Sequence, residues 1–339
     1  MVTRLEVAKL AGVSESTVSR VINESGYVSR DVKVRVLQSI KELNYVPNRI
    51  ARSLRMQESK QIACVTQSIT NSFYSEIVTG IEEIALTNDF TFSLFQVNRK
   101  KSDFLKMALE GFYDGIIILS PFEVMRIIDL EEIHKSLPTV MYWDRELPTT
   151  IPHVFIDLKE AMRNLVRYLI CQGHKEIILL SYKFNEPWEN PRYQGYVEAM
   201  KEYGIPIKPY YMVFVEELHD TLTVGHQLMT KFLNEGHSFS AVVGSNDLLA
   251  LGAMRAIMER GKRVPDDISV VGIDDVELSN IFLPSLTTIQ IPKRLIGQTL
   301  MKQLLSFINR KEDMPQSITF DTNLIERESV KGLVIQDYS

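Results

Sequence analysis

Residues 3–23 read TRLEVAKLAGVSESTVSRVIN, and this stretch predicts two short helices joined by a tight turn. Thr3 and Glu6 are spaced as in a capping box, where each side chain accepts a hydrogen bond from the other residue's backbone N–H. Gly12 suits the turn because glycine adopts sharp backbone conformations at low cost. Ser14 is placed to cap the second helix. The pattern therefore favours a compact helical pair at the start of the chain.

The apolar positions of this pair define an inner face and leave a polar outer face. We expect the inner face to contain Leu5, Ala8, Leu10, Val18, Val21 and Ile22. The outer face then carries Glu15, Ser16, Thr17, Ser19, Arg20 and Asn23. A short face rich in hydrogen-bonding groups fits a DNA major groove, which is about 12 Å wide, and reaches base edges there. The alternative is an ordinary helical hairpin, because many helix pairs turn at a glycine.

The next residues predict a third helix followed by a short basic segment. After Ser29, apolar residues recur at helical spacing, namely Val32, Val36, Leu37, Ile40 and Leu43. Asn44 suits a left-handed helix end, and Pro47 prevents the helix from continuing. Residues 48–55, NRIARSLR, would form a helix of about two turns, which is marginal in water on its own. A disordered basic linker is the alternative for this segment.

Charge is distributed unevenly along the chain. The protein contains 38 Lys and Arg against 43 Asp and Glu, which gives a net charge of −5. Residues 1–60 hold eleven of the basic and six of the acidic residues, so this part carries +5 and the remainder −10. A basic N-terminal part on an acidic body indicates that one end binds phosphate groups while the rest stays away from them.

Length and composition exclude several other classes of protein. The chain has 339 residues, 45% of them hydrophobic, which is enough for one large core or two to three smaller ones. No run of 18 or more apolar residues predicts a membrane span, and the start MVTRLEVAKL is too polar for a signal peptide. Cys64 and Cys171 stand alone, so we expect no disulfide, metal or cofactor site and a reducing, cytoplasmic location.

From residue 61 onward, short apolar runs alternate with helical patterns. The runs include QIACVT, DGIIIL, TVMYW, EIILLS, AVVG and SVVGI. Near-continuous Val, Ile and Leu in such runs predict parallel strands that are covered by helices on both faces. Two series of roughly a hundred residues predict two Rossmann-like lobes. No GxGxxG or GxxxxGK(S/T) motif follows a run, which argues against a dinucleotide or nucleoside triphosphate site.

Polar and aromatic residues stand just after several of these strands, where open parallel sheets bind ligands. Carboxylates and amides bond to vicinal hydroxyls and aromatic rings cover apolar sugar faces, so such residues suit a carbohydrate. They are Asn71, Phe73, Tyr74, Ser120, Asp144, Arg145, Trp188, Arg192, Asn246, Asp247, Asp274 and Asp275.

Several of these residues have a structural alternative. Asp144 and Arg145 could pair with each other, Phe73 could belong to the core, and Trp188 could be an ordinary loop residue. For Asp247 we favour the N-cap of the following helix. Asp275 is also better explained by a structural role. Paired carboxylates can hydrolyse glycosides, but the chain has no GxSxG or HExxH motif and its six histidines are scattered, so we expect no enzyme.

The motifs VAKLAGVSESTVSRVIN, YVS and ELNYVPNRIARSL resemble the DNA-binding head of the LacI/GalR family of bacterial transcriptional regulators. The similarity continues more loosely to the end of the chain. It implies a helix-turn-helix head at 1–46, a hinge helix and linker at 47–60, and an effector-binding and dimerisation body at 61–339 of the periplasmic sugar-binding-protein type. With three crossings between the lobes, lobe one would comprise about 61–157 and 292–320, and lobe two about 158–289 and 323–335.

The resemblance also implies roles for single residues. In the DNA complex, Leu54 of the hinge helix would wedge between central bases, and Arg20 is our candidate for a bidentate guanine contact. The full set of expected DNA contacts is Thr3, Ser14, Glu15, Ser16, Thr17, Ser19, Arg20, Asn23, Tyr27, Asn48, Arg49, Ala51 and Leu54. The expected effector contacts are Phe73, Tyr74, Ser120, Asp144, Arg145, Trp188, Arg192, Asn246 and Asp274.

These observations predict a sequence-specific transcriptional regulator, and of the two kinds we favour a repressor. It would bind palindromic double-stranded operator DNA as a homodimer. A sugar or sugar derivative in the cleft between the lobes would control it. The alternative effectors are a purine and a phosphoprotein corepressor. We expect dimer contacts on the helices that begin near Ser75 and Asp247, the second of which carries Leu248, Leu251, Met254 and Met258. A stand-alone ligand-binding protein is disfavoured because the chain carries a DNA head and shows no export signal.

Overall fold

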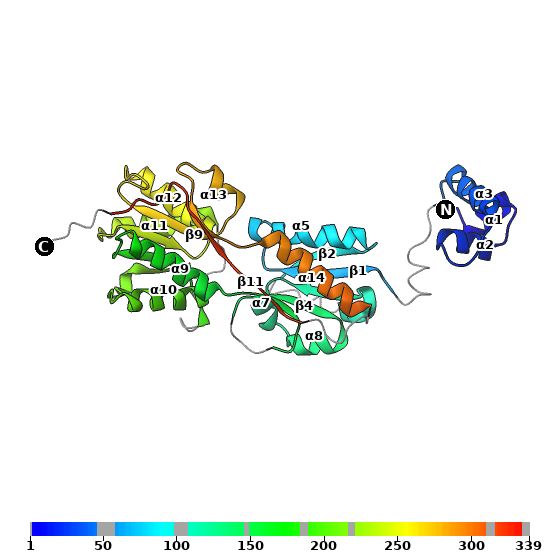
Figure 1. The fold of residues 1–339 in the computed structure, drawn as a ribbon, viewed down its shortest axis with the longest axis horizontal. Helices are drawn as coiled ribbons and strands as arrows, with labels where there is room; N and C mark the ends of the chain where they lie inside the picture. The colour runs from blue at the N-terminus through cyan, green and yellow to red at the C-terminus, as the bar shows by residue number, and fades with distance from the viewer. Residues whose placement is uncertain are drawn as a thin grey trace. The chain divides into compact units, whose positions relative to one another are not determined.

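The computed structural model describes residues 2–45, 58–97, 108–145, 149–183, 189–215, 221–309 and 316–333 (Figure 1). The chain divides into two compact units, Met1–Ser59 and Lys60–Ser339. We call the first unit the head and the second unit the body. The hinge segment expected at 48–55 and Trp188 lie outside the described residues. No helix in the described part of the chain is long and apolar enough to cross a membrane.

The head consists of three helices, α1 (Arg4–Ala11), α2 (Glu15–Ile22) and α3 (Arg30–Glu42). The expected capping box is confirmed, because Thr3 accepts from the Glu6 backbone N–H and Glu6 Oε2 accepts from the Thr3 backbone N–H at 2.7 Å. Gly12 ends α1 with a φ of 65°. Ser14 caps α2 by accepting a hydrogen bond from the backbone N–H of Thr17. The two-helix pattern of residues 3–23 is therefore present.

The core of the head differs in part from the expected apolar face. It is formed by Val7, Ala8, Ala11, Val18, Val21, Val36 and Tyr45. Leu5, Leu10 and Leu37 were expected inside, but each is close to half exposed. The reason is that α1 contacts both α2 and α3, and its small side chains face this double contact. Leu5 and Leu10 lie outside this contact face of α1 and are therefore partly exposed.

The body contains two lobes, each built on a six-stranded sheet. The first sheet has the order β11-β5-β4-β3-β1-β2 and comprises β1 (Gln61–Thr66), β2 (Thr91–Gln96), β3 (Gly115–Ile118), β4 (Thr139–Trp143), β5 (His153–Ile156) and β11 (Ile318–Phe320). The second has the order β12-β10-β9-β8-β6-β7 and comprises β6 (Ile177–Tyr182), β7 (Met212–Val215), β8 (Ala241–Gly244), β9 (Ser269–Asp274), β10 (Thr287–Gln290) and β12 (Asn323–Ile325). All pairs are parallel except β10 with β12. The predicted pair of parallel-sheet lobes is thus confirmed.

Helices cover both faces of each sheet, as Figure 1 shows. The first lobe has α5 (Ser72–Thr87), α7 (Pro121–Met125), α8 (Leu130–Ser136) and α14 (Lys293–Ile308), with the short helix η1 (Ala108–Phe112). The second has α9 (Leu158–Cys171), α10 (Pro191–Glu202), η3 (Pro209–Tyr211), α11 (Leu222–Asn234), α12 (Asp247–Glu259) and α13 (Glu277–Ile281).

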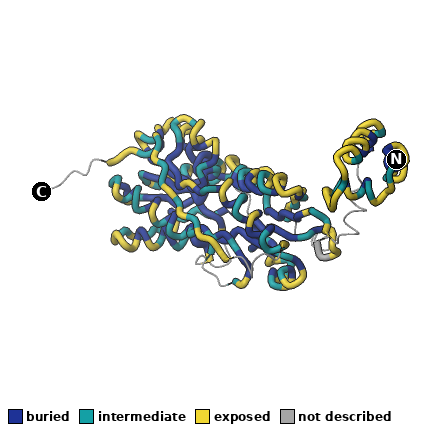
Figure 2. Tube along the Cα trace, turned by 45° about the vertical axis from the view of Figure 1, so that its right-hand side comes forward, coloured by how far each residue is buried: buried dark blue, intermediate teal, exposed yellow. Residues whose placement is uncertain are grey.

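The central strands, such as β1, β3 and β6, are buried along nearly their whole length, which explains their near-continuous apolar sequences (Figure 2). The edge strands β2 and β11 are only partly buried. Along β1, Ile62 and Cys64 pack in one core cluster with residues of α5 and α14. The alternate residues Ala63 and Val65 pack in another cluster with residues of α7 and α8. This alternation follows from the two-residue period of a strand. It leaves the strand ends as the places where polar groups can gather.

The chain passes between the lobes three times. It leaves the first sheet after β5 and enters α9, which packs on β9 and β10 of the second sheet. It returns after β10 into α14, which packs on α5, β3, β4 and β5. The last crossing lies between β11 and β12, at residues 321–322. Each lobe is therefore assembled from segments that are far apart in the sequence.

Helices α5 and α14 pack backbone against backbone through two glycines. A Cβ atom on Gly297 would lie 1.9 Å from the carbonyl oxygen of Ile77. A Cβ atom on Gly80 would lie 2.1 Å from the carbonyl oxygen of Arg294. Neither distance is compatible with a side chain, so both positions require glycine for the helices to approach this closely.

The expected N-cap of α12 was wrong by one residue. Asn246 caps the helix, because its Oδ1 accepts from the Leu249 backbone N–H at 2.9 Å. Asp247 is fully buried and accepts from the Val276 N–H at 2.9 Å. It also accepts from the hydroxyls of Ser279, at 2.7 Å, and Thr288, at 2.5 Å. Burial raises the pKa of Asp247 even though these bonds lower it, and the residue ties α12 to the segments after β9.

The expected dimer face of α12 was also wrong in part. Leu251 and Met254 are completely buried in the core of their own lobe, where α12 packs on α11, β8 and β9. Met258 remains 41% exposed. The excess of apolar residues on α12 is explained by its position between a sheet and α11, since a helix covered on two sides needs two apolar faces.

Candidate functional site

The outer face of the head helix α2 presents the polar residues expected there. Glu15, Ser16 and Arg20 are exposed, whereas Thr17, Ser19 and Asn23 are partly buried. Hydroxyls at the start of α2 bond to one another, with Ser14 Oγ 2.7 Å from Ser16 Oγ and 2.9 Å from Thr17 Oγ1. One turn further on, Asn23 Nδ2 donates to Ser19 Oγ at 3.1 Å.

Arg20 and Tyr27 are two further predicted DNA contacts of the head, and both are exposed. Arg20 lies in the last turn of α2, and its Cδ would meet a Cβ on Gly26 at 4.0 Å. Gly26 has a φ of 73°, so the chain turns there and leaves Tyr27 91% exposed. Thr3 is exposed but already engaged in the capping box. Asn48, Arg49, Ala51 and Leu54 lie outside the described residues, so their roles remain predictions.

The body contains a cavity of about 220 Å³ between its two lobes. In each sheet the first strand lies between the second and third, so the strand order reverses there. Residues that follow the neighbouring strands β1 and β3 meet across this point, since the Gln67 N–H donates to Ser120 Oγ at 2.8 Å. In the second sheet, Asn246 Nδ2 donates to the Tyr182 hydroxyl at 2.5 Å across β6 and β8. The cavity thus lies where open parallel sheets bind ligands.

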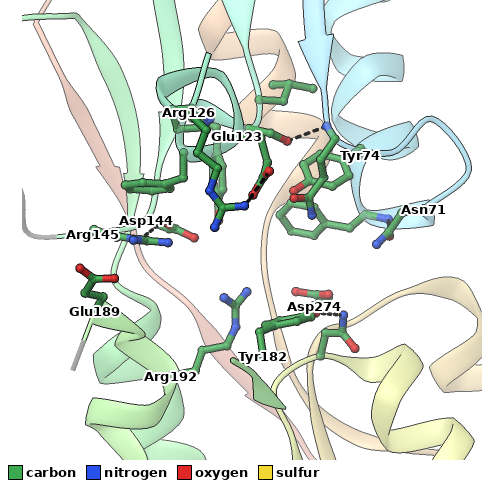
Figure 3. A pocket seen from close by; sticks show the side chains of 18 residues that line it. Asn71, Tyr74, Glu123, Arg126, Asp144, Arg145, Tyr182, Glu189, Arg192 and Asp274 are labelled. Atoms are coloured by element: carbon green, nitrogen blue, oxygen red, sulfur yellow. Dashed lines mark hydrogen bonds and ion pairs between the residues drawn. The ribbon is translucent and has the colours of Figure 1, made fainter. Parts of the chain in front are cut away.

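Figure 3 shows side chains reaching into this cavity from both lobes. Of the nine predicted effector contacts, the structure brings eight together in the cavity wall, and Trp188 lies outside the described residues. The complete lining is Gln67, Asn71, Phe73, Tyr74, Leu119, Ser120, Pro121, Phe122, Glu123, Arg126, Tyr142, Asp144, Arg145, Tyr182, Glu189, Arg192, Asn246 and Asp274.

Two buried donors line the cavity without a hydrogen-bond partner among the described residues. They are the hydroxyl of Tyr142, a residue only 5% exposed, and Nε of Arg192. Burial, and then the charge of Asp144, raises the pKa of Tyr142 well above its usual value, so the hydroxyl keeps its proton. Burial lowers the pKa of Arg192, but the charges of Asp274 and Asp144 outweigh it and the net shift is upward. Both groups are therefore donors at neutral pH.

Acceptors lie close to these donors. Asp144 Oδ1 is buried and makes no hydrogen bond within the described part of the chain, although Arg145 Nε is 3.7 Å away. Asp274, at the end of β9, is 5% exposed and lines the same cavity. The cavity thus presents donors at Arg192 and Tyr142 and an acceptor at Asp144. Leaving these groups unbonded would cost about 1–3 kcal/mol each.

An aromatic and cationic stack forms one wall of the cavity. The Arg145 guanidinium lies 3.3 Å from the centre of the Phe122 ring, and Phe122 stacks on Trp143 with centroids 5.0 Å apart. Burial lowers the pKa of Arg145, and the charge of Asp144 opposes this shift. Near the stack, Arg126 donates to both carboxylate oxygens of Glu123 at 3.1 Å. This wall combines aromatic surface with charged groups, a combination that suits a ring bearing hydroxyls.

Some predicted contacts also have a structural function. Ser120 Oγ and Asn246 hold strand ends together, as described above, and Phe73 is 6% exposed and belongs to the core as well as to the cavity wall. The structural role expected for Asp275 is confirmed. Its carboxylate accepts from Arg327 at 2.6 Å and from Gln290 Nε2 at 2.9 Å.

The sequence-based prediction missed several residues of this wall. Tyr142 lies inside the expected strand run TVMYW, at the last position but one of β4. Tyr182 directly follows the expected run EIILLS and is the last residue of β6. Phe122, Glu123 and Arg126 follow Ser120 on the short helix α7. The signal available for all of these residues was their nearness to a strand end that was already marked.

Lys293 is a further residue that the prediction missed. It is 4% exposed at the start of α14, and its Nζ donates to the carbonyl oxygens of Asp274, at 2.5 Å, and Asp275, at 2.8 Å. Those two residues have positive φ angles of 121° and 53°, a strained conformation for residues other than glycine. The same Nζ lies 3.5 Å from Glu76 on α5 of the first lobe. Lys293 thus connects the strained turn that bears Asp274 to the opposite lobe.

We expect Lys293→Met to weaken effector binding by about tenfold, because Asp274 loses the contacts that hold its backbone in place. Hydrogen exchange at residues 274–276 should quicken in the same variant, which is a direct measure of the freed turn. Lys302→Met, at an exposed position of the same helix, serves as the control. Unchanged affinity and unchanged exchange in Lys293→Met would show that the ammonium group does not position Asp274.

The chain resembles known proteins along nearly its whole length. Residues 4–48 match the family model described as "Bacterial regulatory proteins, lacI family". Residues 59–328 match the model described as "Periplasmic binding proteins and sugar binding domain of LacI family". Among curated proteins, the HTH-type transcriptional repressor PurR of Vibrio cholerae serotype O1 is 33% identical over 338 residues, which cover 98% of this chain and 99% of that protein.

Solved structures give the same result. The lac repressor dimer bound to operator and the anti-inducer ONPF superposes with a TM-score of 0.82 at 31% identity, covering 97% of this chain and 99% of that one. The complex of the transcriptional regulator CelR with cellobiose superposes with a TM-score of 0.69 at 28% identity, covering 97% and 100%. No group of three or more His, Cys, Asp and Glu that could hold a metal ion is found among the residues that the structure describes.

Proposed function

Because the chain belongs to the LacI family of bacterial regulatory proteins, we propose that it represses transcription by binding a palindromic operator as a homodimer. In this proposal residues 1–46 read the DNA, residues 47–60 form the hinge and linker, and residues 61–339 bind an effector and dimerise. The lac repressor structure, which is a dimer on its operator, supports the proposal at 31% identity.

The polar row of α2 would enter the major groove, since its exposed residues carry both donors and acceptors. Arg20 would donate to a guanine, and Glu15 and Ser16 at the start of the helix would select neighbouring bases. The test is selection of binding sites from random duplexes with the purified protein. A two-fold symmetric site is expected from a symmetric dimer, and enrichment of asymmetric or unrelated sequences would contradict the proposal.

The effector in this proposal is a carbohydrate or carbohydrate derivative. The observation that carries it is the set of groups around the cavity, with the buried donors Tyr142 and Arg192 beside the acceptor Asp144. A polyhydroxylated molecule satisfies such a set because each hydroxyl both donates and accepts. The CelR complex with cellobiose supports this class of ligand at 28% identity.

Thermal-shift measurements on the full-length protein test the effector class. A ligand present at about a hundred times its Kd adds about 2.7 kcal/mol of stability, so binding will appear as a higher unfolding temperature. The panel contains neutral sugars, sugar phosphates and purine bases. A purine is the second candidate, because Phe73 and Tyr74 place two rings at the cavity with centroids 5.2 Å apart. Stabilisation by purines alone would replace the carbohydrate proposal.

The hinge leucine gives a separate prediction for DNA binding. We expect Leu54→Ala to weaken operator affinity by about tenfold or more, because the variant loses the apolar wedge that unstacks a base step. The measurement is a titration of the selected operator at fixed salt, since phosphate contacts make affinity depend on salt. Unfolding of the body should be unchanged, and equal operator affinity in variant and wild type would remove Leu54 from the interface.

A further inference from the structure

A second and larger compartment adjoins the effector cavity. Its volume is about 570 Å³, whereas the effector cavity, which is lined by Arg192, measures about 220 Å³. Residues in or next to α7, β4 and β5 of the first lobe form one wall of this compartment, and residues in or next to α9 and α10 of the second lobe form the other. The residues that line this compartment and not the first cavity are Met125, Phe155, Asp157, Lys159, Pro191 and Gln194.

The two compartments share one ridge of four residues, Phe122, Asp144, Arg145 and Glu189. Arg145 lies over Phe122, with its guanidinium carbon 3.3 Å from the ring centre. The side chains of Asp144 and Arg145 are mostly buried, at 20% and 15% exposed. Arg145 thus contacts both Asp144 and Phe122 on the ridge, whereas Glu189 is exposed. A molecule that occupied both compartments would cross directly over the ridge.

The sizes decide between a small and an extended effector. Pockets that enclose drug-sized ligands measure about 300–1,000 Å³. The effector cavity is smaller than this range, and the second compartment falls inside it. We propose that the effector is a disaccharide or longer glycoside. One sugar unit lies in the effector cavity, which Arg192 lines, and the next unit lies in the second compartment, which Lys159 and Gln194 line. This proposal rests on the carbohydrate-controlled function given above.

The residue types of the second compartment fit a sugar unit. Met125 and Phe155 offer apolar surface for the face of a pyranose ring, and Lys159, Glu189 and Gln194 offer charged or amide groups for its hydroxyls. Arg145 on the shared ridge carries only donors. A glycosidic oxygen carries no hydrogen, so it can only accept. Within the ridge, Arg145 is thus the residue matched to the one atom that joins two sugar units, whereas the carboxylates of Asp144 and Glu189 accept only from hydroxyls.

The test compares each disaccharide with its constituent monosaccharide on the full-length protein by calorimetric titration. The probes are glucose with cellobiose and maltose, galactose with lactose and melibiose, xylose with xylobiose, and mannose with mannobiose. We expect at least one disaccharide to bind about tenfold or more tightly than its monosaccharide. A monosaccharide that binds as tightly as every disaccharide containing it overturns the proposal, as does a panel in which no disaccharide binds.

Variants in the second compartment localise the effect. Gln194→Trp should fill the compartment and weaken disaccharide binding by about tenfold while leaving the monosaccharide within about twofold. Lys159→Ala tests the same compartment without added bulk, and a loss confined to the disaccharide is again expected. Gln227→Trp, at an exposed position on α11 outside both linings, is the matched control. Equal losses for both sugars in Gln194→Trp and Lys159→Ala would overturn the proposal.

The two levels of the proposal fail differently. If a monosaccharide binds as tightly as the disaccharides, the extended effector is wrong and the carbohydrate-controlled regulator remains. If purines bind and no sugar does, the effector class itself is wrong and the extended site falls with it.

Discussion

Arg192→Ala is expected to lower effector affinity by about a hundredfold or more while leaving operator affinity within about twofold. The guanidinium is a charged donor at the cavity, and hydrogen bonds to charged groups contribute about 1.5–3 kcal/mol each. Losing two such bonds removes about 3 kcal/mol or more, and every 1.4 kcal/mol is tenfold in affinity. The substitution also removes the positive charge with which the carboxylates of Asp144 and Asp274 interact. The measurement is calorimetric titration of the effector identified by thermal shift.

Arg263→Ala is the matched control for this loss. Arg263 is 68% exposed, pairs with Asp266 and Asp267, and lies outside the cavity lining. Its removal should leave effector binding unchanged. Operator titration with and without effector separates the two functions of Arg192→Ala, because the variant should still bind DNA and should no longer respond. A variant that responds at the wild-type effector concentration would falsify the assignment of Arg192.

Gly297→Val is expected to destabilise the body by about 4 kcal/mol or more. Any Cβ atom at this position meets the carbonyl oxygen of Ile77 at 1.9 Å, and backbone cannot move away as a flexible side chain can. Overpacking of a well-packed contact typically costs 1–3 kcal/mol, and larger losses follow when the clash is with backbone. The contact around the facing glycine is equally close, because a Cβ atom on Gly80 would meet the carbonyl oxygen of Arg294.

Urea unfolding followed by circular dichroism measures this effect, and Lys302→Val controls for the cost of a β-branched residue in a helix. Lys302 is exposed on α14, so its substitution should change stability by well under 1 kcal/mol. Gly297→Ala should already cost most of the loss, since the clash begins at Cβ. Stability equal to that of Lys302→Val would mean that the two helices separate without cost.

The local rules of the sequence were sufficient where the interacting groups are close in the chain. The capping box of Thr3 and Glu6, the turn at Gly12 and the cap at Ser14 each involve residues within three positions of one another. The same rules placed polar residues after the strands, and parallel order brought their ends together at the cavity. These features required no knowledge of distant contacts.

The remaining features depend on contacts that are far apart in sequence. Leu5 and Leu10 satisfied the helical period, but the position of α3 decided which side of α1 is buried. Asp247 stands at a plausible cap position, yet its partners Ser279 and Thr288 are 32 and 41 residues away. Lys293 lies outside every motif, and its function arises only where α14 meets the turn after β9. Periodicity and spacing contain no information on such contacts between distant segments of the chain.

The crossings of the chain impose an order on its synthesis. The first sheet begins with β1, but its edge strand β11 and its covering helix α14 come from residues 293–320, after β6 to β10 of the other lobe. While the ribosome is making that lobe, Ile77 and Ile81 of α5 have no α14 to cover them. Apolar surface exposed in this way is where partly folded chains associate with each other or with chaperones. The first lobe to emerge is therefore completed late, and a chain that stopped at residue 290 would leave it unfinished.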